Sequence, residues 1–359
     1  MNNNKREFNQ LVSKYLLELM ETTKKKYGIN SSEYRALYYQ YIKTDAESQR
    51  MKECNQKHYE AIVDTSKEGL RYIERLYKRQ ATVDLTTACS AHCRYCLRQN
   101  YEEIYMKQKD EDEIIRYLSK DQYLKEVLIT GGDPLLIIDR LIHFLGRVIN
   151  EATNIRIIRI GTRVPVQNPH RLDDRILKFF YENREKVFFE IALQINHKIE
   201  LQSETRNCIR ELQNAGVTIY SQNVLLKNVN ATINDLVCLY DELRYEHIES
   251  HYLFHPIPMS HTAHFRMPLK EFLIIAKELT SSGLIPGRSK PMFSVMTDIG
   301  KCTIYEGMLS EKDEQGYYII NTGYRLNERQ MWNSKYVLPD SAFVGTDGLL
   351  RVKYLDGNS

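Results

Sequence analysis

Short runs of apolar and β-branched residues alternate along the middle of the chain with charged, helix-like stretches. The strand-like runs begin every thirty residues or so, which is the length of a β-α unit. They fall at residues 81–86, 126–130, 155–160, 187–195, 217–225 and 251–254. Helix-like stretches follow them at residues 111–119, 140–150, 173–183, 199–214, 233–245 and 269–281. Six units in series predict an α/β fold in which parallel strands with right-handed crossovers curl into a partial (β/α)6 TIM-like barrel.

Different patterns flank this barrel. Residues 1–80 are polar and carry apolar residues at helical spacing, which predicts a helical N-terminal extension that includes further helical turns at 60–64 and 70–76. Residues 81–285 are expected to form the barrel. Beyond them the alternation stops, and glycines and prolines divide the sequence into short pieces. Residues 286–359 are therefore predicted to be a mixed C-terminal segment that closes the site.

Composition limits the classes of partner. The 359-residue chain has a formal net charge of +3, which is too small to indicate nucleic acid or an anionic membrane as a partner. No segment approaches the length of a membrane span, and no apolar run near the N-terminus has the character of a signal peptide. The cysteines outside one cluster are isolated in the sequence, so disulfides are not expected and a reducing cytoplasm is predicted.

The clustered cysteines are Cys89, Cys93 and Cys96, which stand at a C-x3-C-x2-C spacing directly after the first predicted strand. A [4Fe–4S] cluster usually takes four thiolates, so three leave one iron open for chemistry. A zinc site and chance clustering are the alternatives. Zinc sites typically add a second, distant cysteine pair, and none follows here. The spacing therefore favours an iron–sulfur cluster at the C-terminal end of a barrel strand, where active groups belong.

Polar residues also end the later strands and should converge on one cavity. Gly131, Gly132 and Asp133 follow the second strand, where adjacent glycines permit close backbone approach and supply free amide donors, although an ordinary turn would use them too. His197 is as compatible with a structural role as with a functional one. Arg98 could clamp a carboxylate or be a surface charge. The remaining strand-end groups are Arg159, Arg163, Gln194, Gln222 and Asn223.

Taken together, these residues resemble the lysine 2,3-aminomutase family of radical S-adenosylmethionine (SAM) enzymes. The cysteine spacing alone is typical of the whole radical SAM superfamily, whereas its combination with the glycine loop and with Arg-Ile-Gly-Thr-Arg-Val-Pro is more specific. The matching stretches are residues 89–98, 127–136, 159–165, 194–197, 215–216, 222–226 and 264–266.

The resemblance implies roles for individual residues. Cys89, Cys93 and Cys96 would hold a [4Fe–4S] cluster whose open iron binds SAM. An external reducing electron donor would supply one electron, and cleavage of SAM would give a deoxyadenosyl radical that abstracts a hydrogen from a small-molecule amino-acid substrate. The residues expected to bind the cofactors are Gly131, Gly132, Asp133, Gln194, His197, Gln222 and Lys301.

Family members also use pyridoxal 5'-phosphate (PLP), joined to a lysine that follows a glycine run. The comparable stretch here, residues 291–301, keeps one glycine before Lys301. Lys301 is therefore the expected Schiff-base lysine, with Lys290 as the alternative. A PLP aldimine would support migration of the α-amino group to the β-carbon. The position of Arg98 matches the arginine that binds the substrate carboxylate.

Two departures bear on the substrate and on metal content. Residues 252–261 contain no acid where lysine-specific relatives place an aspartate, and Asp298 is the candidate replacement. The extra C-terminal cysteines that bind zinc in the family are also missing. We therefore expect a 2,3-aminomutase whose substrate is other than, or not restricted to, free lysine, and which could be a homo-oligomer. A related radical SAM enzyme without PLP, and a metal-binding protein without turnover, are the alternatives.

Overall fold

A curled sheet forms the centre of the protein in the computed structural model, which describes residues 9–48, 70–97, 104–305 and 307–357. Within this part of the chain nine strands lie side by side in sequence order. β2 to β8 are parallel, and β1 and β9 pair antiparallel at the two edges. The strands are β1 (Ile73–Glu74), β2 (Gln80–Thr86), β3 (Glu126–Gly131), β4 (Ile157–Thr162), β5 (Phe188–Leu193), β6 (Thr218–Val224), β7 (Glu249–Phe254), β8 (Met292–Thr297) and β9 (Gly300–Thr303).

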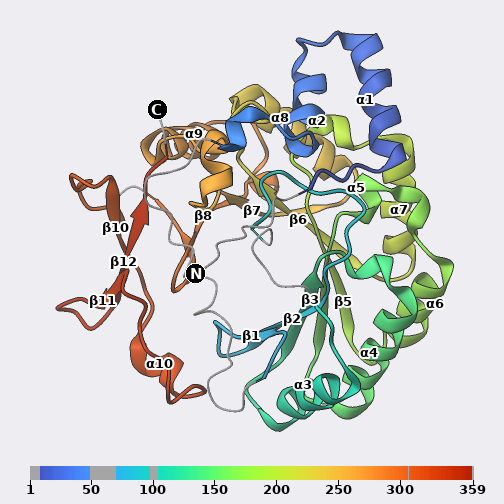
Figure 1. The fold of residues 1–359 in the computed structure, drawn as a ribbon, viewed down its shortest axis with the longest axis vertical. Coiled ribbons are helices and arrows are strands. Elements are labelled where there is room, and N and C mark those ends of the chain that lie inside the picture. The colour runs from blue at the N-terminus through green and yellow to red at the C-terminus, as the bar shows by residue number, and fades with distance from the viewer. Residues whose placement is uncertain (1–8, 49–69, 98–103, 306, 358–359) are drawn as a thin grey trace.

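Helices cover the outer side of this sheet, as Figure 1 shows for the green helices on its right. They are α3 (Gln108–Lys120), α4 (Ile138–Glu151), α6 (Asp174–Asn183), α7 (Ser203–Asn214), α8 (Ile233–Tyr245) and α9 (Leu269–Ser281). Each predicted strand is followed by its predicted helix. The partial barrel is thus confirmed.

Alternation along the strands separates a core face from the barrel lumen. In β3 and β4 every second residue is fully buried and belongs to the main hydrophobic core, as Val127, Ile129, Ile158 and Ile160 do. Residues between them are only partly buried and include charged ones such as Arg159. Because successive side chains of a strand point to opposite faces, apolar residues pack under the helices while polar residues line the lumen.

The N-terminal extension contains α1 (Lys14–Tyr27) and α2 (Ser32–Tyr41), each begun by a serine cap: Ser13 accepts from Leu16 N and Ser31 from Tyr34 N. Both helices contribute to a second hydrophobic cluster that includes Ala91 and Tyr95 of the cysteine segment. The extension therefore packs against the loop that follows β2.

One prediction for this extension is wrong. Residues 70–76 contain β1 instead of helical turns, because Ile73 pairs with Val83 of β2 and is fully buried. Tyr72, just before it, has φ of 66°, outside the right-handed helical region. The predicted turn at 60–64 lies outside the described residues.

The C-terminal residues extend the barrel sheet and then form a small second sheet. β8 and β9 complete the barrel sheet, so the last parallel strand lies beyond residue 285. β10 (Tyr317–Asn321), β12 (Leu350–Leu355) and β11 (Ala342–Val344) form a separate antiparallel sheet, drawn in red on the left of Figure 1. A short helix, α10 (Leu326–Gln330), lies between β10 and β11 in the chain.

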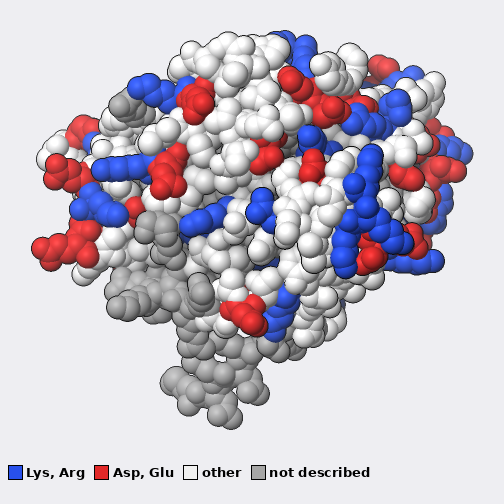
Figure 2. Space-filling view, turned by 90° about the horizontal axis from the view of Figure 1, so that it is seen from above, with Lys and Arg blue, Asp and Glu red and all other residues white. Residues whose placement is uncertain are grey.

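Figure 2 shows basic and acidic side chains interspersed over much of the face seen from above. No helix in the described parts of the chain is long and apolar enough to cross a membrane.

Candidate functional site

The three cysteines lie in the loop that leaves the C-terminal end of β2. Cys89, Cys93 and Cys96 are all partly exposed and none is in a disulfide. A backbone hydrogen bond of 3.0 Å from Cys96 N to Cys93 O closes a turn between the last two. The prediction that placed them at the end of the first parallel strand is therefore correct, and their side chains can reach a bound metal cluster.

Two hydrogen-bond donors point at the sulfur of Cys93. Arg163 Nη1 lies 2.9 Å and Gln167 Nε2 3.2 Å from Cys93 Sγ. Arg163 follows β4, and Gln167 ends the short helix α5 (Val164–Gln167). Burial lowers the pKa of Arg163, but Cys93 and other neighbours outweigh this effect and raise the pKa well above its ordinary value. A guanidinium at this place can donate a hydrogen bond to the sulfur of a metal-bound cysteine.

The arrangement of the three cysteines is compatible with a cluster. Among the described residues, no group of three or more His, Cys, Asp or Glu side chains is arranged to hold one metal ion. In a [4Fe–4S] cluster each thiolate binds a different iron, so the sulfurs do not meet at one point. Three accessible cysteines with donors aimed at one sulfur suit that group.

The glycine loop after β3 lies directly against the base of the cysteine loop. Gly132 N donates to Thr86 O at 2.5 Å, and Asp133 N donates to Ala88 O at 2.7 Å. A Cβ on Gly131 would lie 2.2 Å from Thr86 O, and one on Gly132 would lie 2.2 Å from Ala88 O. The glycines are thus required for backbone contact with the cysteine loop, and the amides of residues 132 and 133 are used within the protein.

We expect Gly132→Ala to destabilise the protein by about 1–3 kcal/mol, because the added methyl group has no space beside Ala88 O. Gly146→Ala is the matched control. Gly146 is inside α4, and a methyl group added there would have nothing within 4 Å, so this change should stabilise the helix by up to about 1 kcal/mol. Urea unfolding of both variants measures the difference, and equal effects at the two glycines would contradict the close contact.

Asp133 joins the glycine loop to the end of β4. Its carboxylate accepts hydrogen bonds from Thr162 Oγ1 at 2.7 and 2.9 Å, from Arg163 N at 2.7 Å and from Leu135 N at 3.2 Å. Burial raises the pKa of Asp133 above its ordinary value, and these hydrogen bonds oppose the rise. The residue therefore positions the loop through contacts within the protein.

The other predicted strand-end groups differ in their surroundings. Gln222, on β6, has a buried Nε2 with no hydrogen-bond partner among the described residues, which fits a donor awaiting a ligand. Gln194 accepts from Tyr95 Oη at 3.3 Å. His197 is fully buried, with Nδ1 accepting from Ile199 N at 3.2 Å and Nε2 3.7 Å from Asp235 Oδ1. Its Nε2 is buried and has no hydrogen-bond partner among the described residues.

Lys301 lies on β9, opposite Met296, which is close to the C-terminal end of β8. Its ammonium nitrogen is 5.2 Å from the ring centre of Tyr252 and 5.7 Å from that of Phe254. Burial lowers the pKa of Lys301 to about 8, with the Arg159 cation adding to the effect and Glu126 opposing it. An amine with this pKa is partly neutral near pH 7 and can act as a nucleophile.

Gly300, directly before this lysine, has φ of 114°, a conformation that favours glycine. A Cβ there would come within 3.2 Å of Tyr77 Oη, and Tyr77 Oη accepts from Lys301 N at 3.0 Å. One glycine is thus enough to turn the chain tightly beside β9.

A charged group formed around Arg159 lies in the lumen near Lys301. Arg159 forms ion pairs with Glu126 at 2.8 Å and Glu190 at 3.0 Å, and its guanidinium is 5.0 Å from the ring centre of Tyr220. Tyr220 Oη and His251 Nδ1 are buried without a hydrogen-bond partner among the described residues. The lumen therefore offers polar groups that a bound molecule could satisfy.

The remaining predicted residues lie elsewhere. Lys290 precedes β8, at the opposite end of that strand from Lys301, and donates to Thr280 O. Asp298 is buried in the turn between β8 and β9 and accepts from Ser341 Oγ. Arg98 lies outside the described residues.

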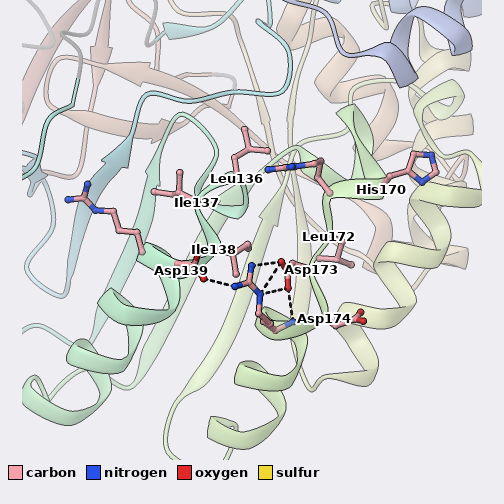
Figure 3. A pocket seen from close by; sticks show the side chains of 11 residues that line it. Leu136, Ile137, Ile138, Asp139, His170, Leu172, Asp173 and Asp174 are labelled. Atoms are coloured by element: carbon pink, nitrogen blue, oxygen red, sulfur yellow. Dashed lines mark hydrogen bonds and ion pairs between the residues drawn. The ribbon is translucent and has the colours of Figure 1, made fainter.

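A cavity of about 820 Å³ opens between the start of α4 and the start of α6. Asp139 and Asp173 belong to its lining (Figure 3), and Arg175 pairs with Asp139 at 2.5 Å and with Asp173 at 2.8 Å. None of the predicted site residues lines this cavity, so the chemistry is assigned to the cysteine loop and the lumen instead.

Comparison with known proteins finds chains with similar sequences. The family model of the radical SAM superfamily matches residues 83–236. A putative L-lysine 2,3-aminomutase of Aquifex aeolicus (strain VF5) is 30% identical over 229 residues, which are 63% of this chain and 60% of that protein. L-lysine 2,3-aminomutase of Buchnera aphidicola subsp. Baizongia pistaciae (strain Bp) is 31% identical over 209 residues, or 58% and 61% of the two chains.

Glutamate 2,3-aminomutase of Clostridioides difficile (strain 630) is 27% identical over 226 residues, 62% of this chain and 52% of that one. Streptococcus suis SuiB, solved with bound S-adenosylmethionine, aligns with a TM-score of 0.44 and 14% identity over 61% of this chain and 50% of that chain. The matched region covers 60–61% of the two lysine aminomutases. With the cysteine loop, the glycine loop and the partial barrel, these matches show that the chain is similar to radical SAM proteins over residues 83–236 and to lysine 2,3-aminomutases over about three fifths of their length.

Proposed function

We propose that the protein is a radical SAM amino-acid 2,3-aminomutase, an isomerase that moves an α-amino group to the β-carbon. The observation that carries this proposal is the position of Lys301. Its amine has a lowered pKa of about 8 and lies against the rings of Tyr252 and Phe254. A partly neutral amine in the lumen can hold PLP.

Different residues are proposed to bind the cluster, to bind SAM and to position the loops around them. Cys89, Cys93 and Cys96 hold the [4Fe–4S] cluster, which supplies the electron that cleaves SAM. Gln222 offers its unpartnered Nε2 to SAM. Gly131, Gly132 and Asp133 contribute by fixing the loop against residues 86–88, so their effect on SAM is indirect.

Lys301 would hold PLP through its amine, and PLP would supply stabilisation of the radical during nitrogen migration. The rings of Tyr252 and Phe254 give the lysine an apolar flank, while Arg159, Tyr220 and His251 offer polar contacts in the lumen. Lys290 is disfavoured because it lies at the other end of β8.

The substrate is proposed to be an amino acid other than, or in addition to, free lysine. Residues 252–261 supply no carboxylate for a side-chain ammonium, and a buried ammonium needs a partner. The Asp298 carboxylate accepts from Ser341, so it has a partner within the protein. Arg98 is proposed as the group that binds the substrate carboxylate.

The proposal is tested by supplying the anaerobically reconstituted protein with SAM, PLP, a reductant and a panel of α-amino acids. We expect methionine and deoxyadenosine from SAM, and a β-amino acid from one or more members of the panel other than lysine. SAM cleavage without PLP uptake or isomer would instead identify a PLP-independent radical enzyme. Bound zinc with no SAM cleavage would identify a metal-binding protein.

A further inference from the structure

The N-terminal extension holds the cysteine loop directly. We call its described residues, 9–48, the clamp. On either side of Cys93 the loop donates a backbone hydrogen bond to the clamp: His92 N to Leu11 O at 2.8 Å, and Arg94 N to Gln40 O at 2.8 Å. The cysteine between these two anchors has little freedom to move relative to the clamp.

A buried ion pair adds to this attachment. Arg94 Nε and Nη2 lie 2.9 and 2.5 Å from the two carboxylate oxygens of Glu47. The side chains of Arg94 and Glu47 are only 1% and 8% exposed. A two-pronged arginine–carboxylate contact fixes orientation as well as distance. Glu47 therefore fixes the loop residue that follows Cys93.

The clamp also orients the arginine that touches the sulfur. Arg163 has five N–H groups, and each has an acceptor. The acceptors are Gln194 O at 3.1 Å, Cys93 Sγ at 2.9 Å, Tyr95 Oη at 2.5 Å, Gln40 Oε1 at 3.3 Å and Glu200 Oε2 at 3.0 Å. Loss of one acceptor frees the guanidinium to turn away from the sulfur.

Gln40 of α2 is fully buried, and both the nitrogen and the oxygen of its side-chain amide form hydrogen bonds. Nε2 donates to Glu200 Oε1 and to Ala36 O, while Oε1 accepts from Arg163 Nη2 and from Asn196 Nδ2 at 3.0 Å. Gln40 thus fixes the orientation of two side chains, those of Arg163 and of Glu200.

The second donor to Cys93 is attached to the clamp as well. Gln167, whose Nε2 reaches the sulfur, receives a hydrogen bond on its backbone carbonyl from Ser13 Oγ. Ser13 is the cap residue of α1. Both donors to Cys93 are therefore attached to the clamp. Arg163 is attached through Gln40 of α2, and Gln167 through Ser13 at the start of α1.

We infer that the clamp is a positioning element for the cluster: it fixes Cys93 for its iron and aims two N–H donors at the sulfur, with Gln40 and Glu47 as its positioning residues. The inference rests on the proposed function because it requires a [4Fe–4S] cluster at Cys93. Hydrogen bonds to cluster sulfurs stabilise the more negative, reduced state, so they make reduction easier.

Two variants of the full-length protein test this inference, with Arg35→Ala, at an exposed position on α2, as the control. Gln40→Met keeps the side-chain length and removes both polar atoms. We expect a normal iron content but a more negative midpoint potential in an EPR-monitored redox titration. At the potential where the wild-type cluster is half reduced, the reduced-to-oxidised ratio should fall about tenfold, or about 59 mV for a one-electron couple.

Glu47→Gln keeps the shape of the side chain and removes its charge, so it remains informative if Gln40→Met does not fold. Iron release to a chelator should become about 10- to 100-fold faster in this variant. Loaded variants with the wild-type potential and the wild-type release rate would overturn the inference alone. A wild-type protein that takes up no iron would overturn the proposed cluster and the inference with it.

Discussion

Lys301→Ala should abolish PLP binding through a Schiff base and reduce aminomutase turnover by on the order of 10³-fold. The amine of Lys301 is the one that the structure places beside the lumen, against Tyr252 and Phe254. The protein is mixed with PLP, and the visible absorption of the lysine–PLP adduct is recorded before and after borohydride reduction. Lys290→Ala is the matched control and should retain the absorption, because Lys290 lies at the other end of β8.

The pH dependence of PLP capture separates Lys301 from an ordinary surface lysine. Only the neutral amine attacks the aldehyde, and burial holds the pKa of Lys301 at about 8 instead of its ordinary 10.5. The capture rate should therefore rise with pH and level off above a midpoint near 8. A midpoint near 10.5, or capture that survives in Lys301→Ala and disappears in Lys290→Ala, would reassign the Schiff-base lysine.

The six β-α units were predictable from the sequence because their strands and helices carry strong local periodicity. β8 was not recognised as the seventh parallel strand. Its sequence contains Ser294 and Thr297, and it is followed by a hairpin to β9 in place of a helix. β1 was mistaken for helix because two residues carry little periodicity, and its strand conformation depends on pairing with β2.

The site was predictable where it is local in sequence. The cysteine motif and the glycine loop each lie within a few residues, so their positions after β2 and β3 could be predicted directly. The contacts of Arg163 were not predictable, because Gln40 and Cys93 lie 123 and 70 residues away from it. Gln40 belongs to no motif, and only the packing of α2 brings it to the arginine.

The sequence contains a pattern from which the charged group in the lumen could have been predicted. Glu126 and Glu190 lie on β3 and β5, the strands that flank Arg159 on β4, and Glu190 is directly opposite Arg159 in the register. Alternation along each strand predicts that all three side chains face the lumen. Active groups gather at the ends of strands, so Arg159 was predicted only as a strand-end group and the two glutamates drew no prediction.

Arg163→Met should lower the free energy of unfolding of the metal-free protein by about 3–5 kcal/mol, because Glu200 is fully buried and would keep an unpaired charge. Urea unfolding followed by circular dichroism measures the loss. The control is Arg175→Ala, which breaks ion pairs of a side chain that is 58% exposed and should cost about 0–1 kcal/mol.

A double variant shows whether the loss comes from the stranded carboxylate or from the missing arginine itself. Glu200→Gln removes the charge but keeps an amide that can still bond Gln40, so Arg163→Met with Glu200→Gln should be more stable than Arg163→Met alone. If the double variant recovers nothing, the cost belongs to the other contacts of the guanidinium, including Tyr95 and Cys93. If Arg163→Met costs no more than Arg175→Ala, then water reaches Glu200 and the network around Cys93 is not the rigid, dry support that its burial indicates.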